Sequence, residues 1–128
     1  MNILLDTHIA LWSLTNDPRL PPEARDLISK EDNRIFWSVA SMWEVAIKRS
    51  IKPEKIPVSG IEYMHYCEQA GYECLSVRDR HVVALESLPS LHNDPFDRIL
   101  VSQALSEGMT FLTHDSVLGG YGKEVMVL

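Results

Sequence analysis

The sequence predicts an α/β fold in which helices cover both faces of a parallel sheet. Short apolar runs that suit buried strands alternate along the chain with segments whose apolar residues recur at helical spacing. Such alternation favours parallel strands joined by helical crossovers. The runs are almost continuously apolar, as is typical of strands buried on both faces of a sheet.

The first half of the chain contains two strand and helix pairs. NILLD (2–6) is an apolar run that ends in an acid, and THIALWSL after it has helical spacing. The last helix of this half starts with Ser41 and carries Glu44 three residues later, the spacing of a capping box. The predicted elements are a strand at 2–6, a helix at 7–14, a loop at 16–22, a helix at 23–31, a strand at 34–39 and a helix at 41–50.

The second half continues the alternation after a Pro-rich connection. Asp94 suits a helix N-cap, Pro95 suits the first helical position, and Gly71 and Gly108 suit helix ends. The predicted elements are a connection at 51–60, a helix at 61–71, a strand at 72–77, a helix at 78–88, a turn at 89–93, a helix at 94–108, a strand at 109–113 and a weak strand at 124–128.

Length and composition indicate one soluble domain over residues 1–128. A chain of 128 residues with 45% hydrophobic content can bury one core. No apolar run reaches the roughly 20 residues of a membrane span, and the first residues lack a secretory leader, so we expect a cytoplasmic protein without a membrane partner. The net charge of −6 excludes binding of nucleic acid through a broad basic field. Any such contact requires a local basic patch or a bound cation.

Four acids fall near strand ends in the predicted fold. Asp6 ends the first strand, Asp115 lies just past the strand at 109–113, and Glu44 and Asp97 lie one turn into their helices. Taken singly, each acid suits a helix cap, a first helical turn or a turn start. Because ligands of open parallel sheets bind beyond the carboxyl ends of the strands, we expect the four to meet at one edge.

Carboxylates that meet in this way repel one another unless a cation binds between them. Oxygen ligands without clustered His or Cys residues favour Mg²⁺ or Mn²⁺ over zinc. Such a cation activates water and polarises phosphate oxygens, so the pattern predicts phosphoryl chemistry.

The remaining polar and aromatic residues give weaker signals. The densest basic cluster suits a solvated helix end or, alternatively, a phosphate or partner contact; it comprises Lys48, Arg49, Lys52 and Lys55. The five scattered histidines are expected to be structural or to contact the site residues without binding the cation themselves. They are His8, His65, His81, His92 and His114. Three tryptophans at apolar positions are expected in the core; they are Trp12, Trp37 and Trp43.

Four ordered blocks resemble the PIN-domain ribonucleases, and most closely the VapC-type toxins of bacterial and archaeal toxin–antitoxin pairs. The blocks are LLDTHIALW, SMWEVAIK, HNDPFDRILVSQA and FLTHD, and the match runs from residue 3 to about 115. The resemblance implies a three-layer αβα sandwich around a parallel sheet of four to five strands. It also implies cleavage of RNA with Mg²⁺ or Mn²⁺, a cognate antitoxin that covers the site, and a homodimer.

The resemblance also implies roles for individual residues. The positions that match the family's acidic metal site are Asp6, Glu44, Asp97 and Asp115, and the hydroxyls of Thr7 and Thr113 match groups often found beside it. Asp94 belongs to a motif common in one branch of the family. The segment SIKPEKIP (50–57) departs from the shorter, Gly-containing turn expected after the second acidic helix.

Two other classes of function compete with the nuclease. A non-catalytic interaction module would keep the fold and bind RNA or a regulator, although retention of all four acids weighs against it. An aspartyl phosphatase would require a second Asp where His8 stands. A phosphoryl receiver would require paired acids after the first strand and a Lys after the last, and neither pattern is present.

Overall fold

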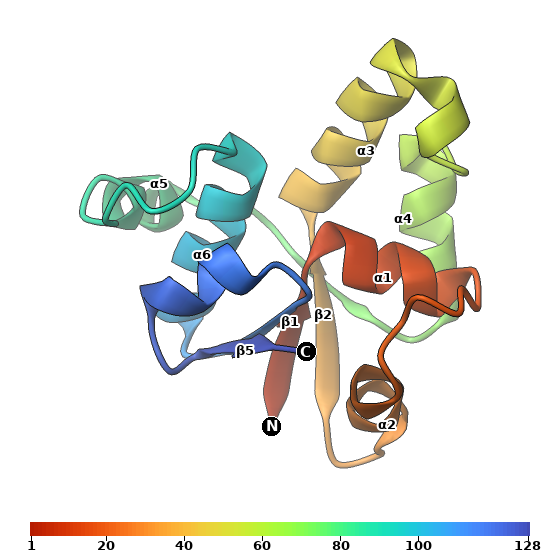
Figure 1. Cartoon of the computed structure of the whole chain (residues 1–128), viewed down its shortest axis with the longest axis horizontal. Coiled ribbons are helices and arrows are strands. Elements are labelled where there is room, and N and C mark those ends of the chain that lie inside the picture. Colours follow the sequence, from red (N-terminus) through yellow and green to blue (C-terminus); the bar gives the residue numbers. More distant parts are fainter.

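A five-stranded parallel sheet forms the centre of the molecule, as the computed structural model of residues 1–128 shows (Figure 1). Its strand order is β3-β2-β1-β4-β5, and every neighbouring pair is parallel. The predicted α/β class with a parallel sheet is therefore confirmed. The strands are β1 (Asn2–Leu5), β2 (Arg34–Ser38), β3 (Glu73–Leu75), β4 (Thr110–Thr113) and β5 (Val125–Val127).

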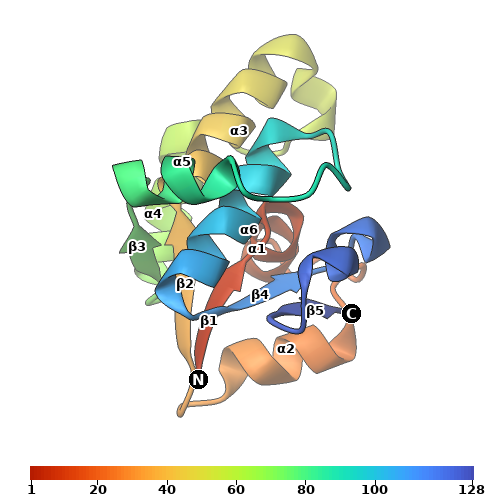
Figure 2. The same ribbon diagram turned by 90° about the vertical axis from the view of Figure 1, so that its left-hand side faces the viewer.

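Helices cover both faces of this sheet and complete the three-layer αβα sandwich. The ribbon seen from two directions places α1, α2 and α4 on one side and α5 and α6 on the other (Figures 1 and 2). The helices are α1 (Thr7–Leu14), α2 (Pro22–Ser29), α3 (Val39–Ile51), α4 (Gly60–Gln69), α5 (Asp79–Leu85) and α6 (Pro95–Glu107), with short 3₁₀ segments η1 (Pro53–Lys55) and η2 (Ser116–Tyr121). No helix combines the length and the apolar character that a membrane crossing requires.

The core has two parts because successive side chains of a strand point to opposite faces. Ile3 and Leu5 of β1 pack into the part under α1, α2 and α4. Leu4 between them packs into the part that contains α6 and η2. All three side chains are fully buried, so β1 is covered on both sides, as its continuous apolar run predicts.

The sheet topology creates a crevice at the carboxyl ends of β1 and β4. Along the sheet, β2 and β3 lie to one side of β1, and β4 and β5 lie to the other. Ile3 is accordingly in register with Ile35 of β2 and with Thr110 of β4. Where the strand order reverses, the connections that leave the two central strands diverge to opposite faces, and a ligand site opens between them.

The amino end of α3 differs from the sequence-based prediction. The helix begins at Val39, and the hydroxyl of Ser38 accepts a hydrogen bond from the amide of Ala40 at 3.0 Å. Ser41 therefore lies inside the helix and is fully buried, so the predicted capping box of Ser41 and Glu44 is wrong. The reason is that Ser38 at the end of β2 already has the extended backbone and the side-chain oxygen of an N-cap. Glu44 is thereby released from capping.

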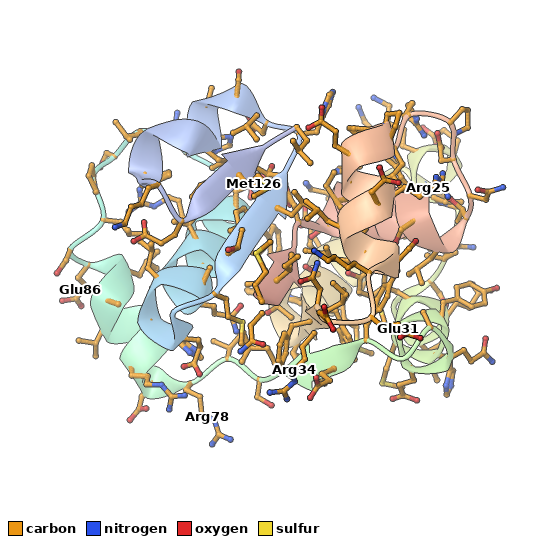
Figure 3. The ribbon with its side chains drawn as sticks, turned by 90° about the horizontal axis from the view of Figure 1, so that it is seen from below. Arg25, Glu31, Arg34, Arg78, Glu86 and Met126 are labelled. Carbon is orange, nitrogen blue, oxygen red and sulfur yellow. The ribbon has the colours of Figure 1, made fainter.

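The opposite edge of the sheet, at the amino ends of the strands, has a cavity lined by both acidic and basic side chains. Figure 3 looks onto this edge and shows Arg34 and Glu31 there. Arg34 forms a two-pronged ion pair with Glu73 of β3, with N–O distances of 2.7 and 2.6 Å. Both side chains are solvent-exposed, so this pair contributes little to stability, typically below about 1 kcal/mol.

Candidate functional site

Asp6 joins the ends of the two central strands. It is the N-cap of α1, and its Oδ1 accepts the amide of Thr7 at 2.7 Å. Its Oδ2 accepts the hydroxyl proton of Thr113 from the end of β4 at 2.6 Å. The residue is only 7% exposed. The N-cap role considered from the sequence is therefore present, but one carboxylate oxygen also faces across the crevice toward β4.

Glu44 of α3 lies beside Asp6 through the side chain of Thr7. The Thr7 hydroxyl donates to Oε1 of Glu44 at 2.6 Å and lies 2.8 Å from the hydroxyl oxygen of Ser41. The second carboxylate oxygen of Glu44 accepts a hydrogen bond from the ammonium of Lys48, one helical turn later. Glu44 is 2% exposed, so this buried charge depends on its polar partners.

The start of α6 separates two aspartates by role. Oδ1 of Asp94 accepts the amides of Phe96 at 2.8 Å and of Asp97 at 3.2 Å, which is an N-cap arrangement. Oδ2 of Asp94 lies 3.7 Å from the ammonium of Lys48. Asp97 makes no capping contact, and its Oδ2 instead lies 3.5 Å from Nε2 of His92.

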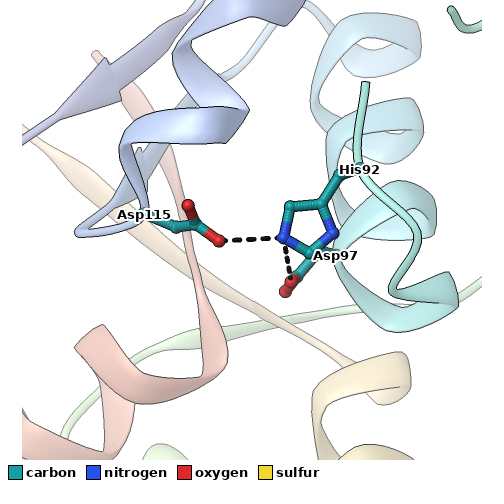
Figure 4. A group of neighbouring side chains, drawn as sticks. All are labelled: His92, Asp97 and Asp115. Carbon is teal, nitrogen blue, oxygen red and sulfur yellow. Dashed lines mark hydrogen bonds and ion pairs between the residues drawn. The ribbon is translucent and has the colours of Figure 1, made fainter. Parts of the chain in front are cut away.

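His92 bridges Asp97 and Asp115 (Figure 4). Its Nε2 lies 2.9 Å from Oδ2 of Asp115, while its Nδ1 accepts the amide of Asp94 at 3.0 Å. Because Nδ1 is an acceptor, a neutral ring carries its proton on Nε2 and donates it toward the two acids. Oδ1 of Asp115 accepts the amide of Val117 at 3.0 Å, so Asp115 also opens η2.

One cavity of about 440 Å³ at this edge brings together all four acids singled out in the sequence. It opens beyond the carboxyl ends of β1 and β4, where the sheet topology places a ligand site. Its lining residues are Asp6, His8, Trp12, Arg19, Glu44, Lys48, His92, Asp97, His114 and Asp115.

The electrostatics of the cavity follow from burial and from mutual repulsion. Burial, together with the negative charges of Asp6, Asp94 and Glu44, raises the pKa of Asp97 to about 7. Burial also raises the pKa of Asp6, and the Glu44 charge adds to this, while the Thr113 hydrogen bond opposes it. Partial burial lowers the pKa of Lys48, but the hydrogen bond to Glu44 and the nearby acids outweigh burial and raise it.

The donor set fits a hard divalent cation. Asp97 and Asp115 each offer a ligand oxygen, and these oxygens and Nε2 of His92 lie within 4.8 Å of one another. Because Nε2 carries the proton of the neutral ring, His92 supports these two acids and is not itself a ligand. The other two acids that line the cavity, Asp6 and Glu44, add only oxygen donors. A site dominated by carboxylates suits Mg²⁺ or Mn²⁺, and a cation there would oppose both the burial and the repulsion that raise the pKa of Asp97.

Several residues of the cavity were not singled out in the sequence. His92 was expected only to be structural or supporting, yet it contacts two of the acids directly. Its position beside the DPFD segment is the one local signal that could have identified it. Arg19 lies in a loop and reaches the cavity while paired with Asp17 at 2.8 Å, and nothing in its local sequence indicates this.

Most of the predicted basic cluster stays together in the fold. Lys48, Lys52 and Lys55 line a cavity beside the acidic one, and Lys48 lines the acidic cavity as well. Arg49 lines neither, because its guanidinium donates to the carbonyl of Ile56 at 3.3 Å.

Comparisons with known proteins agree with this architecture. The family model described as PIN domain matches residues 3–123. Among curated proteins, none matches the chain. The chain is similar in fold to a solved structure described as VapBC2 from Rickettsia felis bound to a DNA fragment from their promoter, with a TM-score of 0.70, 16% identity, and coverage of 100% of this chain and 98% of the other. With nearly its whole length matched by the family model, the chain belongs to the PIN domain family.

Proposed function

We propose that this protein is a metal-dependent endoribonuclease toxin of the VapC type. The observation that supports this most directly is the cavity at the carboxyl ends of β1 and β4, because four carboxylates from four separate segments line it. Membership of the PIN domain family supports a nuclease, and the resemblance of the sequence blocks supports RNA as the substrate.

In this proposal, Asp6, Glu44, Asp97 and Asp115 hold Mg²⁺ or Mn²⁺. The cation, when bound, supplies positive charge that lowers the pKa of the attacking water and stabilises the phosphate oxygens during in-line hydrolysis. The hydroxyls of Thr7 and Thr113 fix the carboxylates of Glu44 and Asp6 at hydrogen-bonding distance.

The other polar groups of the cavity orient the acids and the substrate. The Nε2 proton of His92 holds Asp115 and faces Asp97, which keeps both side chains directed into the cavity. Lys48 balances the charge of buried Glu44 and presents its ammonium at the cavity wall, where it can contact a phosphate.

Cleavage of RNA by the purified protein tests the proposal. Labelled single-stranded, transfer and ribosomal RNA are incubated with Mg²⁺, Mn²⁺ or EDTA, and the products are sized on denaturing gels. We expect internal cleavage with either cation and none with EDTA. Binding of RNA without cleavage under any cation would instead support the non-catalytic interaction module, and release of inorganic phosphate from small phosphoesters alone would support a phosphatase.

An antitoxin is the partner that an acidic cavity of this kind suits. A Lys or Arg side chain inserted from an inhibitor would pair with the acids and displace the cation. The similar solved structure is described as a VapBC2 complex, which agrees with such a partner. We expect the two proteins to meet in the cytoplasm, where the RNA substrate also lies.

Co-purification tests this partner. We expect a small protein encoded next to this chain to co-purify with it and to suppress RNA cleavage, with activity restored after its removal. Full activity in the purified complex would contradict the antitoxin role.

A second copy of the chain is the further partner that we propose. Trp43 was expected in the core, but it is 60% exposed, so that prediction is wrong. It belongs to an exposed apolar stripe along α3, which comprises Val39, Trp43, Ile47 and Ile51. The spacing of four residues places these side chains on one helical face.

An apolar groove of about 440 Å³ between α3, α5 and α6 lies next to the stripe and includes Val39 and Trp43 in its lining. A twofold arrangement could place the Trp43 ring of each copy in the groove of the other, since a C₂ interface uses the same patch on both subunits. Buried tryptophans are frequent binding hot spots.

Replacing Trp43 by Glu is expected to weaken this dimer at least about a hundredfold, because a buried interfacial charge without a partner costs several kcal/mol. Sedimentation velocity at several protein concentrations measures the change. The matched control is Ile61→Glu, which introduces the same charge at a 58% exposed position on α4. Equal behaviour of the two variants would exclude Trp43 from the interface.

A further inference from the structure

A second cavity, of about 190 Å³, lies beside the acidic one and has the opposite charge. It is lined by His8, Lys48, Lys52, Lys55 and two isoleucines, and no carboxylate contributes to its wall. His8 and Lys48 line both cavities, so the two cavities adjoin at these residues. In a chain with a net charge of −6, three ammonium groups around one small cavity form a strong local concentration of positive charge.

Two of these lysines have no partner within the protein. Lys48 is paired with Glu44 and lies near Asp94. Neither Lys52 nor Lys55 takes part in any salt bridge of the chain. Their charges are therefore available to an anion from outside.

The turn that carries these lysines is held in a defined shape. Pro53 starts the η1 turn, and the amide of Lys55 donates to the carbonyl of Lys52 at 3.1 Å. Arg49 donates to the carbonyl of Ile56 and so ties the end of the turn back to α3. Ile56 itself is buried in the core. Little backbone entropy is then lost when an anion binds between the lysines.

The spacing along α3 points from the acidic cavity to the basic one. Glu44 and Lys48 lie one turn apart on the same face of α3. Lys52 follows as the C-cap residue of this helix, and Lys48 and Lys52 both line the basic cavity. A ligand that extends from the acidic cavity past the end of α3 therefore meets Lys48 and then Lys52. A nucleic-acid strand carries a phosphate on every nucleotide, so it presents negative charge at successive positions along such a path.

We propose that the cavity between Lys52, Lys55 and His8 binds a backbone phosphate of single-stranded RNA next to the phosphate that is cleaved. This inference rests on the proposed nuclease function and adds a specific subsite to it. The subsite holds the strand by charge and not by base identity, so it positions the substrate without selecting its sequence.

Salt-dependent RNA binding tests the subsite. Affinity for a fluorescent single-stranded RNA is measured by anisotropy at several salt concentrations, in EDTA and in the Asp97→Asn background so that the RNA stays intact. We expect Lys52→Ala/Lys55→Ala to bind about five- to tenfold more weakly at 0.1 M salt. The slope of log affinity against log salt concentration should become less negative by about 0.7, the value expected for the loss of one phosphate contact on a single strand.

The matched control removes two lysines from the opposite part of the molecule. Lys30→Ala/Lys123→Ala makes the same change of net charge, and both residues are exposed and precede the amino ends of strands. This variant should keep the salt slope of its parent, and Lys52→Arg/Lys55→Arg should retain most of the affinity. Equal slopes for the two alanine pairs would overturn the proposal. This holds even if Lys52→Ala/Lys55→Ala alone loses binding to a partner protein, because the lysines would then contact that protein and not RNA.

Cleavage assays separate this proposal from the nuclease function. Loss of salt slope together with absent cleavage by the unmodified protein would keep the phosphate subsite and reject the nuclease. Cleavage with an unchanged KM in Lys52→Ala/Lys55→Ala, together with an unchanged slope, would keep the nuclease and reject the subsite.

Discussion

Replacing Asp97 by Asn is expected to abolish RNA cleavage while the fold stays intact. The amide keeps the shape of the side chain but removes its negative charge from a cavity that suits a divalent cation. Loss of charge stabilisation at a catalytic centre typically costs two to three orders of magnitude in rate, so we expect a decrease of at least about a hundredfold. Initial cleavage rates at saturating Mn²⁺ measure the effect, and circular dichroism reports on the fold.

Asp94→Ser is the matched variant at the same helix start. Serine retains an oxygen that can accept the first-turn amides now bound by Asp94, so the cost in stability should stay near or below about 1 kcal/mol. Its loss of charge removes a contact of 3.7 Å to Lys48 and one of the negative charges that raise the pKa of Asp97. We therefore expect much of the cleavage rate to remain.

The pair of variants distinguishes three outcomes. An inactive Asp94→Ser with an active Asp97→Asn would reverse the two roles. Activity in both would mean that the DPFD segment is only a well-capped helix start. Inactivity in both, with native circular dichroism, would give Asp94 a part in the site beyond capping.

The protein without metal is expected to become more stable on mild acidification. The pKa of Asp97 is raised to about 7, from an ordinary value of 3.8, and that of Asp6 is raised as well. The native state therefore binds more protons than the unfolded state between these values, and the free energy of unfolding falls as pH rises through this window. Each fully linked carboxyl contributes at most about 1.4 kcal/mol per pH unit, and residual solvent contact reduces this.

Urea unfolding in EDTA at pH 5.5 and at pH 7.5 measures this linkage. We expect a higher midpoint at pH 5.5 in the wild type and a smaller difference in Asp97→Asn, which has no carboxyl to titrate at that position. A midpoint that falls on acidification by the same amount in both proteins would contradict the assignment.

Adding Mn²⁺ at pH 7.5 should stabilise the same protein. A cation that binds only the native state adds about 1.4 kcal/mol at ten times its Kd, which corresponds to roughly 4 to 7 °C in Tm for a chain of this size. Coincident melting curves in EDTA and in excess Mn²⁺ would exclude the metal site.

The sequence predicted the parts of this site that depend on strand ends. Asp6 and Asp115 follow apolar runs that could be recognised as strands, and parallel topology brings the carboxyl ends of strands to one edge. Asp97 lies in the first turn of α6 and Glu44 in the second turn of α3, and both helices start at the same edge. For these residues, local pattern and topology were sufficient.

Other features depend on contacts that no local pattern specifies. The orientation of His92 is set by an amide two residues later and an acid from another element. The N-cap of α3 is Ser38 and not Ser41, because β2 ends at Ser38 and α3 begins at the next residue. The exposure of Trp43 reflects which face of α3 is left uncovered, and helical spacing alone does not choose that face.

The hydrogen bond between Asp6 and Thr113 also has a consequence for biosynthesis. The two residues are 107 positions apart in the sequence. The central strand β1 cannot pair with β4 until β4 has been synthesised. Ribosomes add about 5 to 20 residues per second, so the first acid emerges well before its neighbours exist. Nascent chains and fragments that end before β4 therefore lack an assembled site, and any activity that depends on all four acids can begin only once synthesis is nearly complete.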